Sequence, residues 1–125
     1  MQDRLAWVVT ALSGFITVMA GAFGAHGLRD QISERMLDVF ATGVRYQAWH
    51  TLAMLALLVW RQSRPLRGQS VALWLWGMGI VLFSGSLYLL TLTGTRSLGA
   101  ITPFGGLLLM GGWLALAVTA WRARP

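Results

Sequence analysis

The chain has no cysteine and no lysine among its 125 residues. Without cysteine it can form no disulfide, no thiolate metal site and no sulfur nucleophile. Cysteine usage therefore carries no information about the compartment in which the protein resides.

Acidic residues are also scarce, and none of them falls within a long apolar stretch. The four are Asp3, Asp30, Glu34 and Asp38. Two histidines without cysteine, and without an Asp or Glu inside the predicted membrane spans, disfavour a closed zinc site, and a pair such as Ser84 and His50 lacks the acidic third member of a hydrolase triad. No glycine-rich phosphate loop, nucleophile elbow or HExxH helix is present. We therefore expect no catalytic residue, no metal site, no cofactor and no enzymatic activity.

Hydrophobic residues are abundant instead. They make up 56% of the chain against 11% charged residues, a composition typical of integral membrane proteins. All ten basic residues are arginines, and the resulting pI near 11.6 could suggest a nucleic-acid partner. Because these arginines flank apolar runs and do not cluster on one soluble face, we expect a lipid bilayer as the partner and no nucleic acid.

Four apolar stretches could cross a hydrocarbon core about 30 Å thick. They cover residues 5–25, 46–60, 71–93 and 103–121. At a rise of about 1.5 Å per residue the second stretch reaches only about 22 Å, so its helix must begin earlier or Arg45 must extend to the interface. The predicted fold is all-α: an integral membrane four-helix bundle formed by residues 1–125 as a single domain.

Two helix starts carry recognisable signals. Ser33 is a fair N-cap, and the apolar spacing from Glu34 to Val44 suits a short amphipathic interfacial segment between the first and second helices. Thr102 can cap the fourth helix, and Pro103 fits its first position.

The arginines predict an orientation. Arg4, Arg61, Arg64, Arg67, Arg122 and Arg124 lie on the side of the termini and the middle loop, whereas Arg29, Arg35, Arg45 and Arg96 lie on the other. The middle loop, RQSRPLRGQ, holds three arginines and no acid, so the positive-inside rule predicts cytoplasmic termini. Five of the seven tryptophans support this by falling at the predicted cytoplasmic boundary: Trp7, Trp60, Trp74, Trp76 and Trp121.

The first helix carries a ridge of small residues. Its members recur about every fourth position: Ser13, Thr17, Gly21 and Ala25, with Ala20 and Gly24 beside them. Such a ridge lets a second helix approach closely in lipid, where hydrophobicity no longer drives association. The neighbour could be within the chain, in a second copy or in a membrane partner protein, so a homo-oligomer is permitted.

Polar residues inside the predicted bundle form a candidate cluster in its outer half. They are His26, Tyr46, Gln47, His50, Ser84, Tyr88 and Thr102. Helix rise puts His50 and Ser84 near the midplane, Tyr46 and Tyr88 about 20 Å above the cytoplasmic tryptophans, and His26 and Thr102 about 28 Å above them. We therefore expect three layers: His50 with Ser84, Tyr46 with Tyr88, and His26 with Thr102. Ser86 points away from Ser84 and should serve another interface.

Two hypotheses explain this cluster. In the first, a neutral His50 bonded to Tyr88 or Ser84 fixes helix register, for about 0.6 to 2 kcal/mol per bond. In the second, the cluster lines an outward-facing pocket in which His50 binds or relays a proton.

Four motifs in order resemble one family. GAFGAH at residues 21–26, YQAWHTLA at 46–53, LFSGSLY at 82–88 and TPFGG at 102–106 closely resemble the YgdD-like family of small bacterial inner-membrane proteins with eukaryotic transmembrane relatives. The resemblance implies a four-span membrane protein of a family without an established substrate or cofactor. It also implies that the positions characterising the family are largely the polar ones named above, together with Ser86 and Pro103.

These observations lead to two functional expectations. The first is a non-enzymatic structural or partner-binding module of a bacterial inner membrane, with its termini in the cytoplasm. The second is a small transporter or proton-coupled binding protein whose pocket opens outward between His26 and His50.

Overall fold

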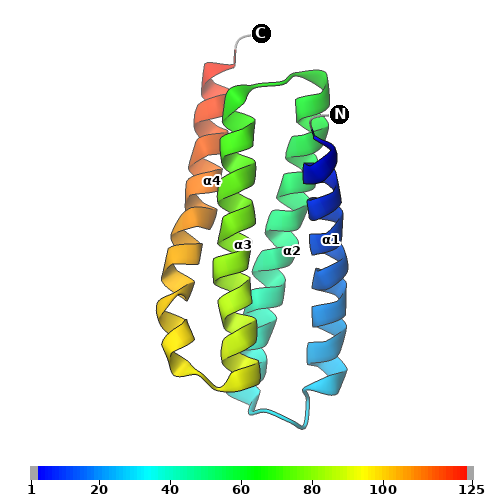
Figure 1. The fold of residues 1–125 in the computed structure, drawn as a ribbon, viewed down its shortest axis with the longest axis vertical. Helices are drawn as coiled ribbons and strands as arrows, with labels where there is room; N and C mark the ends of the chain where they lie inside the picture. The colour runs from blue at the N-terminus through cyan, green and yellow to red at the C-terminus, as the bar shows by residue number, and fades with distance from the viewer. Residues whose placement is uncertain (1–2, 124–125) are drawn as a thin grey trace.

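The fold was analysed in a computed structural model that describes residues 3–123. Its helices are α1 (Arg4–Ala22), continued by a π-helical segment (Phe23–Gly27), α2 (Glu34–Ser63), α3 (Arg67–Thr93), a 3-10 segment (Arg96–Ala100) and α4 (Thr102–Arg122). The four long helices run up and down alongside one another, with both ends of the chain and the α2–α3 loop at one end of the bundle (Figure 1). Residues 3–123 contain no β-strand, so the expected all-α fold is confirmed for this part of the chain.

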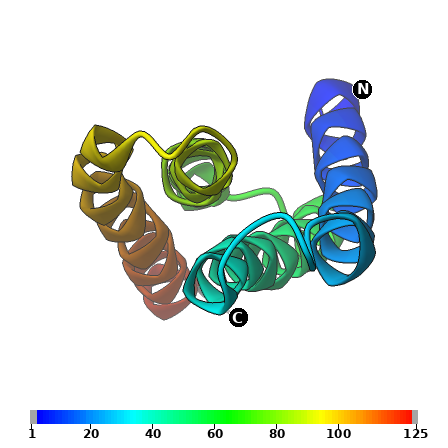
Figure 2. The same cartoon turned by 90° about the horizontal axis from the view of Figure 1, so that it is seen from below.

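The helices pack in chain order. The main contacts join α1 to α2, α2 to α3, and α3 to α4. Viewed along the bundle, α1 and α4 lie at opposite edges of this arrangement (Figure 2). Much of the surface of α1 and α4 is consequently exposed and apolar.

Three helices are long and apolar enough to cross a membrane, judged by length and composition. They comprise Arg4–Gly27, Arg67–Thr93 and Arg96–Arg122. The predicted spans at 5–25, 71–93 and 103–121 fall within these three. The remaining helix, α2, carries more polar side chains along its length.

The second helix differs from its predicted form. The side chain of Ser33 accepts a hydrogen bond from the Met36 amide at 3.2 Å, so the predicted cap is present and α2 begins at Glu34. The helix then continues unbroken for 30 residues to Ser63. The predicted stretch at 46–60 is therefore part of a longer helix, and within residues 3–123 no separate interfacial segment is seen. No proline interrupts residues 34–63, and so nothing in the backbone forces a turn there.

The fourth helix begins at the predicted residue, but the predicted side-chain cap is absent. It starts at Thr102, with Pro103 in its first turn. The Thr102 side chain caps no backbone amide of α4, because its hydroxyl is bonded to Ser86 on α3. The predicted boundary is confirmed, and the predicted side-chain cap is wrong.

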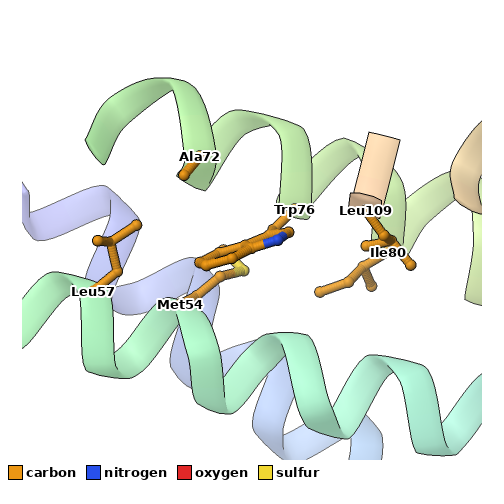
Figure 3. Close-up of a cluster of buried hydrophobic side chains, with 6 residues drawn as sticks. All are labelled: Met54, Leu57, Ala72, Trp76, Ile80 and Leu109. Carbon is orange, nitrogen blue, oxygen red and sulfur yellow. The ribbon is translucent and has the colours of Figure 1, made fainter. Parts of the chain in front are cut away.

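The core lies where α2, α3 and α4 meet. Its buried members are Met54, Leu57, Ala72, Trp76, Ile80 and Leu109. Figure 3 shows the indole of Trp76 reaching from α3 toward Met54 on α2. Trp76 is 0% exposed and belongs to this core, whereas Trp74 and Trp121 are exposed.

Arg61 connects three helix ends through an ion pair and a hydrogen bond, at the end of the bundle that holds the α2–α3 loop. The Arg61 guanidinium lies 3.0 Å from the Asp3 carboxylate and donates to the Ser70 hydroxyl at 2.7 Å. One arginine thus connects the start of α1, the end of α2 and the start of α3. Arg124, counted in the predicted charge bias, lies outside the described residues.

Candidate functional site

A hydrogen-bonded polar network joins α1, α2 and α3. The Tyr88 hydroxyl donates to Gln47 Oε1 at 2.7 Å, and Gln47 Nε2 donates to the Ser13 hydroxyl at 3.1 Å and to the Ser13 carbonyl at 3.2 Å. The Ser13 hydroxyl also lies 2.7 Å from that of Thr51. We call Ser13, Gln47, Thr51 and Tyr88 the polar network. Gln47 is its centre, because a buried amide both accepts and donates and so connects two neighbouring helices.

Ser84 forms a separate bond between α3 and α2. Its hydroxyl is buried and donates to the Gly43 carbonyl at 2.6 Å. Gly43 also allows the ring of Tyr88 to lie against α2, since a Cβ at that position would come within 2.9 Å of Tyr88 Cε1. Ser84 therefore pairs with the backbone of α2, and the predicted pairing of Ser84 with His50 is wrong.

His50 is held between α2 and α4. The Trp113 indole donates to His50 Nε2 at 2.9 Å, and His50 Nδ1 lies 2.7 Å from the Tyr46 carbonyl. An indole N–H can only donate, so Nε2 must be the acceptor, and the proton on Nδ1 is the one donated to the carbonyl. Both ring nitrogens are thereby engaged in a neutral imidazole. The expected partners, Ser84 and Tyr88, are replaced by Trp113.

Aromatic rings surround this imidazole. The Tyr46 ring is nearly parallel to it at a centroid distance of 6.3 Å, while Trp113 and Trp76 approach edge-on at 5.8 and 6.3 Å. Tyr46 also packs against Phe83 at 4.8 Å. Tyr46 and Tyr88 do not form the predicted layer, because the Tyr88 ring packs on Phe40 at 4.9 Å.

Ser86 and Thr102 connect α3 to α4. Their hydroxyl oxygens lie 2.6 Å apart, and Ser86 donates to the Phe83 carbonyl at 2.9 Å, so Thr102 is the donor to Ser86. The expectation that Ser86 serves a different interface from Ser84 is confirmed. His26 is exposed near the end of the π-helical segment, and α1 does not pack against α4, so the predicted pairing of His26 with Thr102 does not form.

The small-residue ridge of α1 faces α2. Ser13 bonds to Thr51 and Gln47, a Cβ on Gly21 would lie 3.6 Å from Val44 Cγ1, and one on Gly24 would lie 2.9 Å from the Phe40 ring. The other two predicted members are Thr17, which donates to the Ser13 carbonyl at 2.8 Å, and Ala25, which is exposed. The neighbour that the ridge approaches is therefore within the chain.

The chemistry available to these groups is limited by their bonds. Each polar side chain of the polar network is bonded to another helix, and both nitrogens of His50 are used. Within residues 3–123 no three His, Asp or Glu side chains gather into a possible metal site. Two buried polar atoms in that range lack a hydrogen-bond partner, Thr10 Oγ1 and Trp76 Nε1. The arrangement resembles interhelical hydrogen bonding more than a reactive centre.

Two members of these contacts escaped prediction from the sequence. Thr51 follows His50 directly and looks like an ordinary small polar residue, and Trp113 lies far from the predicted cytoplasmic boundary. The available signal for Trp113 was its position, since a tryptophan away from both interfaces needs a buried partner for its N–H.

Comparison with known proteins identifies the family. A family model described as "Protein of unknown function (DUF423)" matches residues 20–106. The inner membrane protein YgdD of Escherichia coli, named as a member of UPF0382, is 39% identical over 99% of this chain and 95% of its own length. The chain belongs to this family. The resemblance predicted from the four motifs is confirmed.

Other UPF0382 relatives are as similar. A UPF0382 membrane protein of Staphylococcus haemolyticus is 41% identical over 95% of this chain and 97% of its own length. YwdK of Bacillus subtilis is 40% identical over 90% of this chain and 93% of its own length. No solved structure matches the chain. The present UPF0382 protein is thus a membrane protein of an uncharacterised family, with relatives in several bacteria.

Proposed function

We propose that this UPF0382 protein is a non-enzymatic membrane module, structural or partner-binding, whose polar side chains fix the positions of its helices. The observation that carries the proposal is the pairing of the polar network and of both His50 nitrogens with other protein groups. Gln47 alone connects Tyr88 of α3 to Ser13 of α1, and His50 connects α2 to Trp113 of α4. A side chain that binds a substrate needs a free donor or acceptor, and these residues use theirs on one another.

In this proposal α2 is the fourth span. Its 30 residues correspond to about 45 Å of helix, which exceeds the thickness of the hydrocarbon core. Gln47 and His50 are buried against other helices, so they add little cost to placing α2 in lipid. The first turns, which carry Glu34 and Asp38, would then lie at the outer headgroup region and take the role predicted for an interfacial segment.

We further propose that the protein lies in a bacterial inner membrane with both termini in the cytoplasm. The E. coli relative is named an inner membrane protein. Both termini and the arginine-rich loop between α2 and α3 are at one end of the bundle (Figure 1), which supports a common cytoplasmic side.

A second candidate function is a small transporter or proton-coupled binding protein with an outward-facing pocket. A groove of about 490 Å³ between the ends of α1 and α2, at the predicted outer end, favours it. His50 does not line this groove. The structural module therefore remains the leading proposal.

A flux measurement separates the two. The protein is reconstituted into proteoliposomes with an enclosed pH-sensitive dye, and a pH gradient is applied across the membrane. We expect the same rate of proton entry as in protein-free liposomes, because the imidazole of His50 is engaged at both nitrogens.

The histidine variants provide the control. A flux that His50→Gln abolishes and His26→Gln leaves intact would overturn the structural proposal in favour of the transporter. His26 is the matched control because it is exposed and lies outside the polar network.

A further inference from the structure

The groove at the outer end of the bundle has an apolar floor. It lies between the last turns of α1, with the π-helical segment, and the first half of α2, and it encloses about 490 Å³. Its lining includes Gly21 and Gly24 before Gly27, and Phe40 and Val44 on α2. Gly21 and Gly24 lie against Val44 and Phe40, since a Cβ on Gly24 would come within 2.9 Å of the Phe40 ring, and the groove runs beside this contact along Ala20, Leu37 and Ala41. An apolar groove of this volume accommodates part of a hydrocarbon chain.

The rim of the groove is charged. Arg29, Asp38 and Arg45 all line it and all are exposed. Neither guanidinium forms a hydrogen bond or ion pair with any residue in the described range 3–123, in contrast to Arg61, which is paired with Asp3. Two arginines against one aspartate leave one positive charge in excess at the rim.

The position of Arg45 along the bundle is unusual for a free charge. The preceding residue, Val44, lies beside Gly21, which is six residues before the end of the π-helical segment at Gly27. At 1.5 Å per residue, Arg45 stands about 9 Å inside the end of the first spanning helix. An exposed arginine at that depth is stabilised by an anion at the boundary between headgroups and hydrocarbon.

We propose that this groove is a binding site for an anionic phospholipid of the surrounding leaflet. The phosphodiester is held at the rim by Arg29 and Arg45, whose planar guanidinium groups match phosphate oxygens. One acyl chain lies in the groove along Ala20, Leu37 and Ala41. The excess positive charge selects an anionic headgroup over a zwitterionic one. This site goes beyond the module function, since the polar network would fix the helices whether or not the groove were occupied.

The test is a titration of purified protein in detergent with phosphatidylglycerol, followed by native mass spectrometry. Each arginine near a phosphate contributes about 1 kcal/mol, which corresponds to about a five-fold change in affinity. We expect Arg29→Gln and Arg45→Gln each to raise the half-saturating lipid concentration about five-fold, and the double variant about 25-fold. Arg96→Gln removes an exposed arginine at the same end of the bundle that does not line the groove, and it should bind as the wild type does.

Three further binding measurements identify which part of the lipid is recognised. Asp38→Asn should tighten binding of phosphatidylglycerol, because it removes a negative charge from the rim. Phosphatidylcholine should bind more weakly than phosphatidylglycerol, and inorganic phosphate at the same concentration should not compete, since it lacks the acyl chain. Equal binding by the double variant and Arg96→Gln would overturn the site. Full competition by inorganic phosphate would reduce it to a simple anion site, and equal binding of phosphatidylcholine would refute the charge selection.

Discussion

Gln47 is the residue on which the connection of α1 to the rest of the molecule most depends. Its amide accepts from Tyr88 and donates to Ser13, so one side chain holds three helices in register. Removing a buried partner leaves the others unsatisfied, which costs about 1 to 3 kcal/mol, whereas deleting both ends of one bond costs less than the sum.

A double-mutant cycle tests this role. We expect Gln47→Leu to lower stability by about 1 to 3 kcal/mol and Tyr88→Phe by about 0.6 to 2 kcal/mol, with a coupling of at least about 0.5 kcal/mol between them. Thermal unfolding in detergent or SDS titration provides the measurement. Thr42→Val is the control, because its hydroxyl bonds only within α2, to the Asp38 carbonyl. Strict additivity of Gln47→Leu and Tyr88→Phe would contradict the bond.

At the residue scale, sequence could predict which polar side chains are buried but not their partners. Counting helix rise located Gln47, His50, Ser84 and Tyr88 inside the bundle, and all four are at least half-buried. Depth gives no information on how each helix is rotated or how far a side chain reaches. The indole of Trp113 extends from α4 to His50 and replaces the short Ser84 hydroxyl that the depth count suggested.

At the scale of elements, glycines control how closely α3 and α4 approach. A Cβ on Gly105 would collide with the backbone of Phe83, and one on Gly112 would collide with the Trp76 indole. Gly79 presents a similar contact, because its Cβ would lie 2.6 Å from Leu109 Cδ2. The two helices meet backbone to backbone at Gly105, and such contacts allow close association of helices in lipid.

Neighbouring glycines supply a matched pair of variants. Gly105→Ala forces apart two backbones that cannot yield, and we expect a loss of about 1 to 3 kcal/mol in unfolding experiments. Gly106→Ala meets nothing closer than 3.8 Å, at Phe83 Cδ1, and should be neutral or slightly stabilising because alanine favours helix. Equal melting temperatures for the two variants would show that the close approach does not exist.

Element boundaries followed from the sequence where a local signal was present. Pro103 marked the start of α4 and Ser33 the start of α2. The interfacial segment is not confirmed as a separate element, because amphipathic spacing describes a helical surface and does not show whether the helix continues. Gly43 does not interrupt α2, and the Tyr88 ring packs against α2 at this glycine, where a side chain would collide with it.

For the whole molecule, the absence of cysteine makes the proposed topology directly measurable. Ser63→Cys and Ser97→Cys introduce exposed thiols at opposite ends of the bundle while keeping every arginine. If the termini are cytoplasmic, a membrane-impermeant maleimide added to intact spheroplasts labels Ser97→Cys, and Ser63→Cys reacts only after the membrane is opened. Labelling in the reverse order would contradict the proposed orientation.

The order of contacts along the chain has a consequence for biogenesis. Each helix packs mainly on the one synthesised before it, so successive hairpins can assemble as they leave the translocon, with little loop closure over long distances. Two side-chain hydrogen bonds join residues far apart in the sequence. The partner of Gln47, Tyr88, is synthesised 41 positions later, and the partner of His50, Trp113, 63 positions later. Until then Gln47 has only its bonds to Ser13 on α1, and His50 Nε2 lacks the indole of Trp113. If α2 spans the membrane as proposed, we expect truncations before Trp113 to leave His50 unpaired in lipid and to shorten the lifetime of the chain in cells relative to the full-length protein.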